Sequence, residues 1–275
     1  MGLGFILLGY VVVWQEGISL KRAIKLVFPF WLAVIPVVFQ NYFLGSQNEG
    51  FHSSGTLAQT YMTMQTIPWR YLGLFFYPFS LSSLYQVPLI LSPAGPFFIL
   101  SLIGNLCTIG FLIYWMCKKH PIGFWLVFVL FLFLPYANLI PTSTLMADRY
   151  AYLFLPGLIA LTLIAIRKII SLIPSPLSQK YEPWILMTIL AAIFPALLLQ
   201  THIRRDTWHN SFTLWNDVSA RYPQNAVSYV ALGHAYALTQ RPIMAESAFF
   251  KSIALDRSNF QAFHNLGALY YDLKN

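Results

Sequence analysis

Two neighbouring ionisable residues, Asp148 and Arg149, stand where an apolar stretch begins, and they are the foremost candidates for chemistry in this sequence. An ionisable pair at the end of a membrane helix is costly, which makes it a candidate for function. The planar guanidinium of Arg149 could grip a phosphate or pyrophosphate, and Asp148 could orient it or act on a hydroxyl. Arg149 could equally anchor the helix at the interface, with Tyr150 and Tyr152 in an aromatic belt. The spacing leaves both interpretations open.

Other candidate residues are weaker. Glu49 is a possible catalytic carboxylate, but its polar, Gly- and Ser-bearing surroundings are typical of a solvated loop. His202, Asp206 and His209 follow helical spacing without an evident fourth ligand, so we expect no metal site. The sequence contains no Gly-rich phosphate loop, zinc-binding spacing or nucleophile elbow.

The composition of the chain places these residues in a membrane protein. Hydrophobic residues make up 57% of the 275 residues and charged residues only 9%, whereas a soluble domain carries roughly 25% charged residues. Charged residues are concentrated after residue 202. We therefore predict a transmembrane domain over residues 1–202 and a water-facing part over residues 203–275. The net charge of +8 fits cytoplasmic loops, and the absence of basic runs argues against nucleic-acid binding.

Apolar stretches predict about six helices that cross the bilayer. They are Gly2–Trp14, Leu26–Leu44, Pro96–Cys117, Ile122–Tyr136, Tyr152–Ile166 and Trp184–Gln200. A further patch, Tyr71–Phe79, is too short to span and is predicted to lie at the interface or to re-enter the bilayer. The first stretch is short and lacks the basic start of a signal peptide, so we expect the chain to begin inside a helix.

Basic residues alternate between the loops and predict the orientation of the chain. Lysine and arginine gather in three loops, at 21–25, 118–119 and 167–180, whereas the loops at 45–95 and 137–151 carry one arginine each. The positive-inside rule makes the three basic loops cytoplasmic. Six crossings then place the part after residue 202 outside the cytoplasm. Arg204 and Arg205 argue mildly against this orientation, because they flank the sixth span on its predicted outer side.

The C-terminal part repeats at an offset of 34 residues, which is typical of tetratricopeptide repeats. The repeat predicts helices near 208–221, 226–239, 242–255 and 260–273, which stack as hairpins and offer a surface to a peptide or partner protein. Small and aromatic residues are expected to pack these helices together. They are Leu232, Gly233, Tyr236, Ala245, Leu266, Gly267 and Tyr270. The fold class is therefore all-α: a multispanning helix bundle followed by tetratricopeptide-like hairpins.

Three stretches resemble the transmembrane and tetratricopeptide-repeat O-mannosyltransferase family. They are Trp69-Arg70-Tyr71-Leu72 with Tyr77-Pro78-Phe79-Ser80-Leu81-Ser82, then Asn138-Leu139-Ile140-Pro141 with Ala147-Asp148-Arg149-Tyr150-Ala151-Tyr152-Leu153, and finally Trp208, Asn210-Ser211 and Leu214-Trp215. The likeness covers roughly residues 60–275. It implies a GT-C type membrane glycosyltransferase of a bacterial inner membrane or an endoplasmic reticulum.

This resemblance implies transfer of a sugar from a polyprenyl-phosphate donor to a Ser or Thr hydroxyl on the extracytoplasmic side, with the repeats holding the acceptor. Arg149 and Arg70 are then expected to contact the donor phosphate, with Asp148 orienting Arg149. The family usually places an acidic catalytic residue in its first outer loop, and no predicted outer loop before residue 45 holds one. Glu49 is a poor substitute, so the chain resembles the C-terminal part of such an enzyme. The alternative function is a non-catalytic, membrane-anchored scaffold whose repeats bind proteins.

Overall fold

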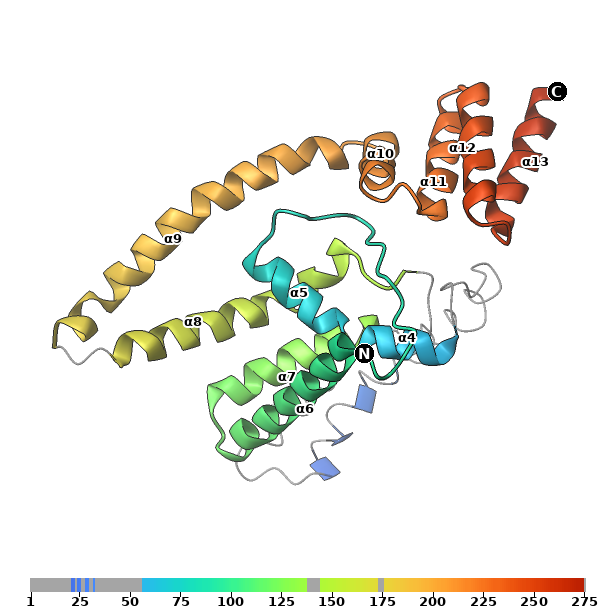
Figure 1. Cartoon of the computed structure of the whole chain (residues 1–275). Coiled ribbons are helices and arrows are strands. Elements are labelled where there is room, and N and C mark those ends of the chain that lie inside the picture. Colours follow the sequence, from blue (N-terminus) through green and yellow to red (C-terminus); the bar gives the residue numbers. More distant parts are fainter. Residues whose placement is uncertain are drawn as a thin grey trace. The chain divides into compact units, whose positions relative to one another are not determined.

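The computed structural model describes residues 56–137, 144–172 and 176–274, with isolated positions between 21 and 32 (Figure 1). Within these residues every regular element is helical, which confirms the predicted all-α class. The chain divides into two compact units. The first comprises Met1–Ser80 and Val87–Ile185, and the second comprises Leu81–Gln86 and Leu186–Asn275. The boundary predicted at residues 202/203 stays a prediction.

The first unit is built from helices that begin at recognisable caps. They are α4 (Leu57–Met64), α5 (Ile67–Phe76), α6 (Pro96–Cys117), α7 (Pro121–Phe133), the short 3-10 helices η2 (Leu134–Tyr136) and η3 (Asp148–Leu153), and α8 (Leu155–Ser171). Thr56 and Gln59 cap α4 reciprocally, and proline occupies the first turn of α5 to α8, where no backbone donor is needed. Helix α7 packs against both α6 and α8.

A tight turn joins α6 to α7. Lys119 adopts a left-handed conformation with φ 50°, and the imidazole Nδ1 of His120 accepts a hydrogen bond of 3.2 Å from the backbone N–H of Ile122. Gly123 sits at the closest approach of the two helices, because a Cβ there would lie 2.9 Å from the backbone nitrogen of Met116. The turn therefore makes α6 and α7 neighbours in the fold.

The second unit ends in four successive helices that follow α9 (Pro176–Arg205) and η4 (Asp206–Trp208). They are α10 (Ser211–Arg221), α11 (Ala226–Leu238), α12 (Pro242–Leu255) and α13 (Phe260–Lys274). Each packs against the next, and α11 also touches α13 (Figure 1). Their bounds lie within three residues of those predicted from the 34-residue repeat.

Two helices in the described part of the chain are long and apolar enough to cross a membrane. They are Pro96–Cys117, which coincides with the third predicted span, and Tyr181–Trp208, which contains the sixth. The fourth predicted span corresponds to a shorter apolar helical stretch, Pro121–Tyr136. The fifth corresponds to α8, which has 17 residues. The first two lie outside the described residues apart from isolated positions, so the number of crossings and the orientation stay predictions.

One helix end and one helix start differ from the predicted segments, and both changes lie next to a proline. The patch predicted over Tyr71–Phe79 loses its helix after Phe76, because Pro78 disfavours helical backbone at Tyr77. The stretch predicted from Tyr152 begins as the 3-10 helix η3 and becomes α-helical only at Leu155, next to Pro156. The Asp148–Arg149 pair therefore stands on a short, tight helix in front of α8.

Candidate functional site

The backbone immediately before the Asp148–Arg149 pair is held by one tyrosine. The hydroxyl of Tyr71, on α5, donates a hydrogen bond of 2.8 Å to the carbonyl of Ala147 and accepts one of 3.1 Å from its backbone N–H. Both residues are buried. Because one hydroxyl pairs with both backbone polar groups of the buried Ala147, it fixes the point at which η3 begins. We call this pair of bonds the Tyr71–Ala147 clamp.

Aromatic rings surround the clamp. The ring of Tyr71 makes edge contacts with Phe133 at the end of α7, at 6.2 Å between centroids, and with Phe154 before α8, at 5.4 Å. The rings of Phe133 and Phe154 also touch, at 5.7 Å. Burial raises the pKa of Tyr71 well above its usual value. The hydroxyl therefore keeps its proton and can donate to Ala147 throughout the physiological pH range.

Arg149 projects from this fixed point. Its side chain is exposed, its guanidinium carbon lies 5.0 Å from the ring centroid of Tyr150, and its Nη2 donates a long hydrogen bond of 3.5 Å to the Tyr150 hydroxyl. Tyr150 in turn stacks on Tyr136 at 4.4 Å. No ion pair within the described part of the chain includes Arg149. Its guanidinium is thus oriented by an aromatic face while most of its donors remain available for an anion.

The other predicted phosphate ligand, Arg70, lies on the helix that carries the clamp. Its side chain is half-buried, with the guanidinium carbon 5.4 Å from the ring centroid of Phe97 and Nε donating to the Thr66 hydroxyl at 3.4 Å. Arg70 precedes Tyr71 directly in the sequence. The Tyr71–Ala147 clamp therefore joins two of the three stretches on which the family resemblance depends.

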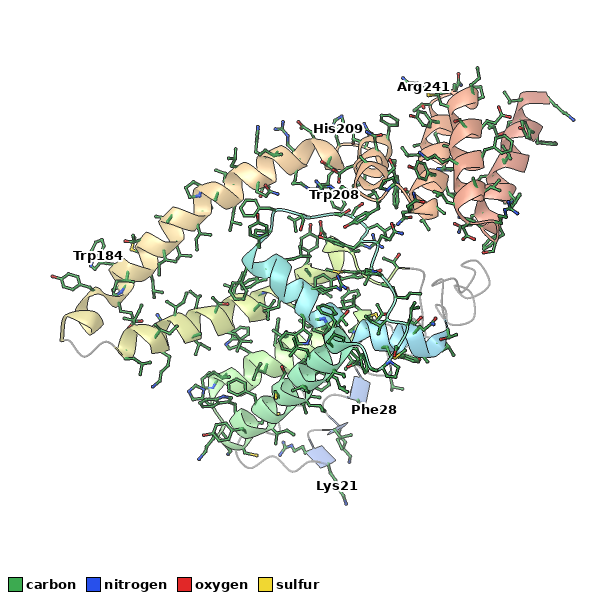
Figure 2. All side chains as sticks on the ribbon, viewed as in Figure 1. Lys21, Phe28, Trp184, Trp208, His209 and Arg241 are labelled. Carbon is green, nitrogen blue, oxygen red and sulfur yellow. The ribbon has the colours of Figure 1, made fainter. Side chains whose placement is uncertain are left out.

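The third stretch, after α9, serves as a helix start. The Asn210 side chain accepts a 2.9 Å hydrogen bond from the N–H of Thr213, and the Thr213 hydroxyl accepts one of 3.2 Å from the N–H of Asn210. Trp215 packs against the buried cluster around Tyr229 and Leu232. Figure 2 shows Trp208 between α9 and α10. Asn210 and Trp215 therefore have structural roles of their own.

Asn105 makes a polar contact between helices that the sequence prediction missed. The indole Nε1 of Trp69 donates to its side-chain oxygen at 2.9 Å and to the carbonyl of Ser101 at 3.2 Å, and its Nδ2 donates to the Gln65 carbonyl at 2.9 Å. A Cβ at Gly104 would lie 2.3 Å from the Trp69 ring. An amide inside an apolar 22-residue helix is a signal that could have identified this position.

The predicted packing residues of the repeats fall into two groups. Leu232, Ala245 and Leu266 are buried in the contacts among the hairpin helices. A Cβ at Gly233 would lie 2.4 Å from the ring of Phe249, whereas one at Gly267 meets nothing within 4 Å. The remaining aromatic pair lies nearer the surface: Tyr236 is half-buried against Phe212, and Tyr270 is exposed and donates its hydroxyl hydrogen to Glu246.

Glu49 cannot be compared with the structure, because the predicted outer loop over residues 45–95 is described only from residue 56 onward. Over the residues that are described, no group of three or more His, Cys, Asp and Glu side chains could hold a metal ion. No family model, curated protein or solved structure matches this chain.

Proposed function

We propose that this chain is a membrane glycosyltransferase-like protein, or part of one, that transfers a sugar from a polyprenyl-phosphate donor to a Ser or Thr hydroxyl outside the cytoplasm. The observation that supports it is the Tyr71–Ala147 clamp, which fixes the backbone just before an exposed, aromatic-backed arginine. A phosphate-binding guanidinium needs this combination of a fixed base and unoccupied donors.

In this proposal Arg149 binds the donor phosphate and Tyr150 holds its guanidinium plane. Arg70 supplies a second cation from α5, and Asp148, at the first position of η3, stands beside Arg149 without an ion pair to it within the described residues, so its proposed orienting role applies to the donor-bound state. Neutralising the phosphate assists departure of the polyprenyl-phosphate leaving group while the acceptor oxygen attacks the sugar carbon. The acceptor proton passes to a carboxylate that the family resemblance places in another outer loop.

The membrane setting is supported by α6 and α9. Both have the length and composition of spanning helices, and very few of their residues are buried inside the protein. A polyprenyl chain is soluble only in the bilayer, so a site at the end of an apolar helix is the place where its phosphate would be presented. The helices α10–α13 would bind the acceptor protein.

A non-catalytic scaffold is the second candidate, favoured by the surface of the hairpins. Large apolar side chains are exposed on α12 and α13, with Ile243, Met244, Phe263 and Tyr271 among them. Where such side chains gather into one patch, the surface can bind another protein. In this case the membrane part serves as an anchor, and Arg149 is an interfacial residue.

A transfer assay distinguishes the two functions. Membranes containing the full chain are incubated with a radiolabelled polyprenyl-phosphate sugar, and label on Ser and Thr of an acceptor protein is measured. Arg149→Ala is expected to lower transfer about a hundredfold, since it removes the donors that stabilise the leaving phosphate. Arg149→Lys keeps the charge but loses the planar fork and should retain only part of the activity. Lys168→Ala, which removes an exposed cation from α8, is the matched control and should transfer normally.

Each result has a direct meaning. Unchanged transfer by Arg149→Ala would contradict the site assignment. A wild-type chain that neither transfers nor binds the labelled donor, while a photo-crosslinker at Phe263 captures a defined protein, would favour the scaffold.

A further inference from the structure

A buried arginine with an unoccupied edge lies at the end of α9. The side chain of Arg204 is only 9% exposed. Its Nη1 pairs with the Asp217 carboxylate at 3.0 Å, but neither Nε nor Nη2 has a hydrogen-bond partner in the described part of the chain. Buried polar groups are nearly always paired, and an unpaired donor next to a charge is costly. The protein has therefore removed these two donors of Arg204 from water without supplying an acceptor for them.

The two unpaired atoms define the shape of the missing acceptor. In a guanidinium, the Nε–H and one Nη2–H point in parallel from the same edge of the plane. This edge matches the spacing of two oxygens on a phosphate or carboxylate and forms the bidentate pair typical of arginine. A single water or a carbonyl oxygen would satisfy only part of it.

The charges around Arg204 favour an anion. Asp217 is shared, because its carboxylate also accepts from Nε of Arg221 at 3.0 Å and 3.1 Å. Two guanidinium groups thus face one carboxylate, which leaves an excess positive charge in a partly buried position. The neighbouring pair, Arg205 and Asp206 at 3.2 Å, is neutral and largely exposed. The local field therefore attracts one further negative group.

The position of Arg204 favours phosphate among the possible anions. It lies in the last turn of α9, close to the end of the apolar stretch Tyr181–Trp208. If that stretch crosses a bilayer, its end lies at the depth of the phosphate-bearing headgroups. The phosphate of a headgroup is therefore the anion that this position would bring to Arg204.

We infer that Arg204 binds a phosphate group through Nε and Nη2, with Asp217 fixing the guanidinium from its other side. The group is supplied either by a phospholipid headgroup or by a soluble phosphate compound. The site does not depend on sugar transfer and uses none of the residues proposed to bind the donor, so each proposal can fail without the other.

Ligand-induced stabilisation tests the site. The full chain is purified in a nonionic maltoside and Tris buffer, and its thermal midpoint is followed as inorganic phosphate is added, with chloride at matched ionic strength as control. A second titration adds phosphatidylglycerol to the micelles, with diacylglycerol as the phosphate-free control. At least one phosphate source is expected to raise the midpoint of the wild type beyond its control. An effect of inorganic phosphate identifies a soluble ligand, and an effect of phosphatidylglycerol alone identifies a headgroup.

Two substitutions assign the effect to the arginine edge. Arg204→Lys keeps the charge but loses the parallel donors, and should weaken the apparent affinity at least about tenfold. Arg205→Lys, the exposed neighbour, should behave as the wild type does. The inference is overturned if both phosphate sources only match their controls, or if Arg204→Lys responds as the wild type does.

Because Arg204 is buried, the lysine variant could fail to fold, and a third variant keeps the test decisive. Asp217→Asn retains both arginines and an amide oxygen that can still accept from Nη1 of Arg204, but it removes the negative charge that competes with the phosphate. Its thermal midpoint should rise more steeply with the effective phosphate source than that of the wild type. An equal or weaker response overturns the inference.

Discussion

The contact between α5 and α6 and the contact between α11 and α12 are alike in their packing but differ in their hydrogen bonds. In both, a glycine lies against an aromatic ring: Gly104 against Trp69, and Gly233 against Phe249. In the hairpins the ring carries no polar atom and is held only by the shape of its surroundings. On α5 the aromatic side chains also make directed hydrogen bonds, from Trp69 to Asn105 and from Tyr71 to Ala147.

The difference follows from what surrounds each pair. Around α6 most side chains are apolar and exposed, so if it lies in lipid, as proposed, burial gives little preference for one neighbour over another. Hydrogen bonds then set which faces meet. If α11 and α12 face water, as predicted from the sequence, burial of Phe249 and Ala245 is a sufficient driving force for their contact. The following predictions test this contrast.

The largest effect is expected for Phe249→Ala. Phe249 is 1% exposed and fills the space beside Gly233, so its removal should destabilise the hairpins by about 3–5 kcal/mol. Phe250→Ala, on the same helix but 51% exposed, is the control and should change stability by less than about 0.5 kcal/mol. Amide hydrogen exchange in α11–α13 of the full chain measures both. Equal protection in the two variants would show that Phe249 does not hold the helices together.

Tyr71→Phe tests the hydrogen-bonded side of the contrast. It keeps the ring and removes only the hydroxyl, which leaves the buried N–H of Ala147 unpaired, whereas the carbonyl keeps the hydrogen bond of 3.1 Å from the N–H of Tyr150. The cost is about 1–3 kcal/mol for the unpaired N–H. Tyr77→Phe, at an exposed tyrosine of the same region, is the control. Denaturation of the full chain in detergent measures the stability. If Tyr71→Phe is as stable as Tyr77→Phe, packing alone fixes the start of η3.

A pair of glycine substitutions should change stability in opposite directions. Gly233→Ala places a methyl group against the buried Phe249 ring and should cost about 1–3 kcal/mol through overpacking. Gly267→Ala meets nothing within 4 Å and should stabilise α13 by about 0.5–1 kcal/mol, as alanine favours helix over glycine. Hydrogen exchange of α11 and α13 gives the sign of each change. Changes of the same sign would mean that the two repeat positions are equivalent.

The sequence predicted the bounds of helices α10–α13 better than the contacts of the candidate site, and the glycines show why. A 34-residue offset places Gly233 and Gly267 in equivalent positions and gives the helix bounds, because each helix packs on its sequence neighbour. It could not distinguish the two glycines, since the ring of Phe249 covers only one of them.

At the candidate site, Asp148 and Arg149 were predicted from local spacing, but the clamp was not. Tyr71 and Ala147 are 76 residues apart, and no periodicity relates them. Trp69 and Asn105 are 36 residues apart and equally unrelated in pattern. Contacts of this kind depend on how distant helices fold together, which a residue pattern along one helix does not encode.

The smallest effect concerns a polar link on the surface of the hairpins, where the Tyr270 hydroxyl donates to Glu246. This hydrogen bond to the carboxylate raises the pKa of Tyr270 above its ordinary value of 10.0. A raised folded-state pKa means that the contribution to stability is complete below about pH 10 and is lost as the pH rises through the folded pKa. Because Tyr270 is exposed, solvent screens the link and its effect on stability should be slight.

The difference in tyrosinate absorbance between the wild type and Tyr270→Phe should therefore follow one phenol with a raised pKa. In Glu246→Gln the pKa of Tyr270 should return towards its ordinary value. Tyr271→Phe is the control, because removing the exposed hydroxyl of Tyr271 should leave the titration of Tyr270 unaffected. If Tyr270 titrates normally in the wild type, the bond is not maintained in solution, and the contact of α12 with α13 depends on apolar packing alone. That outcome would extend the contrast: hydrogen bonds would matter on α5 and would be dispensable between α12 and α13.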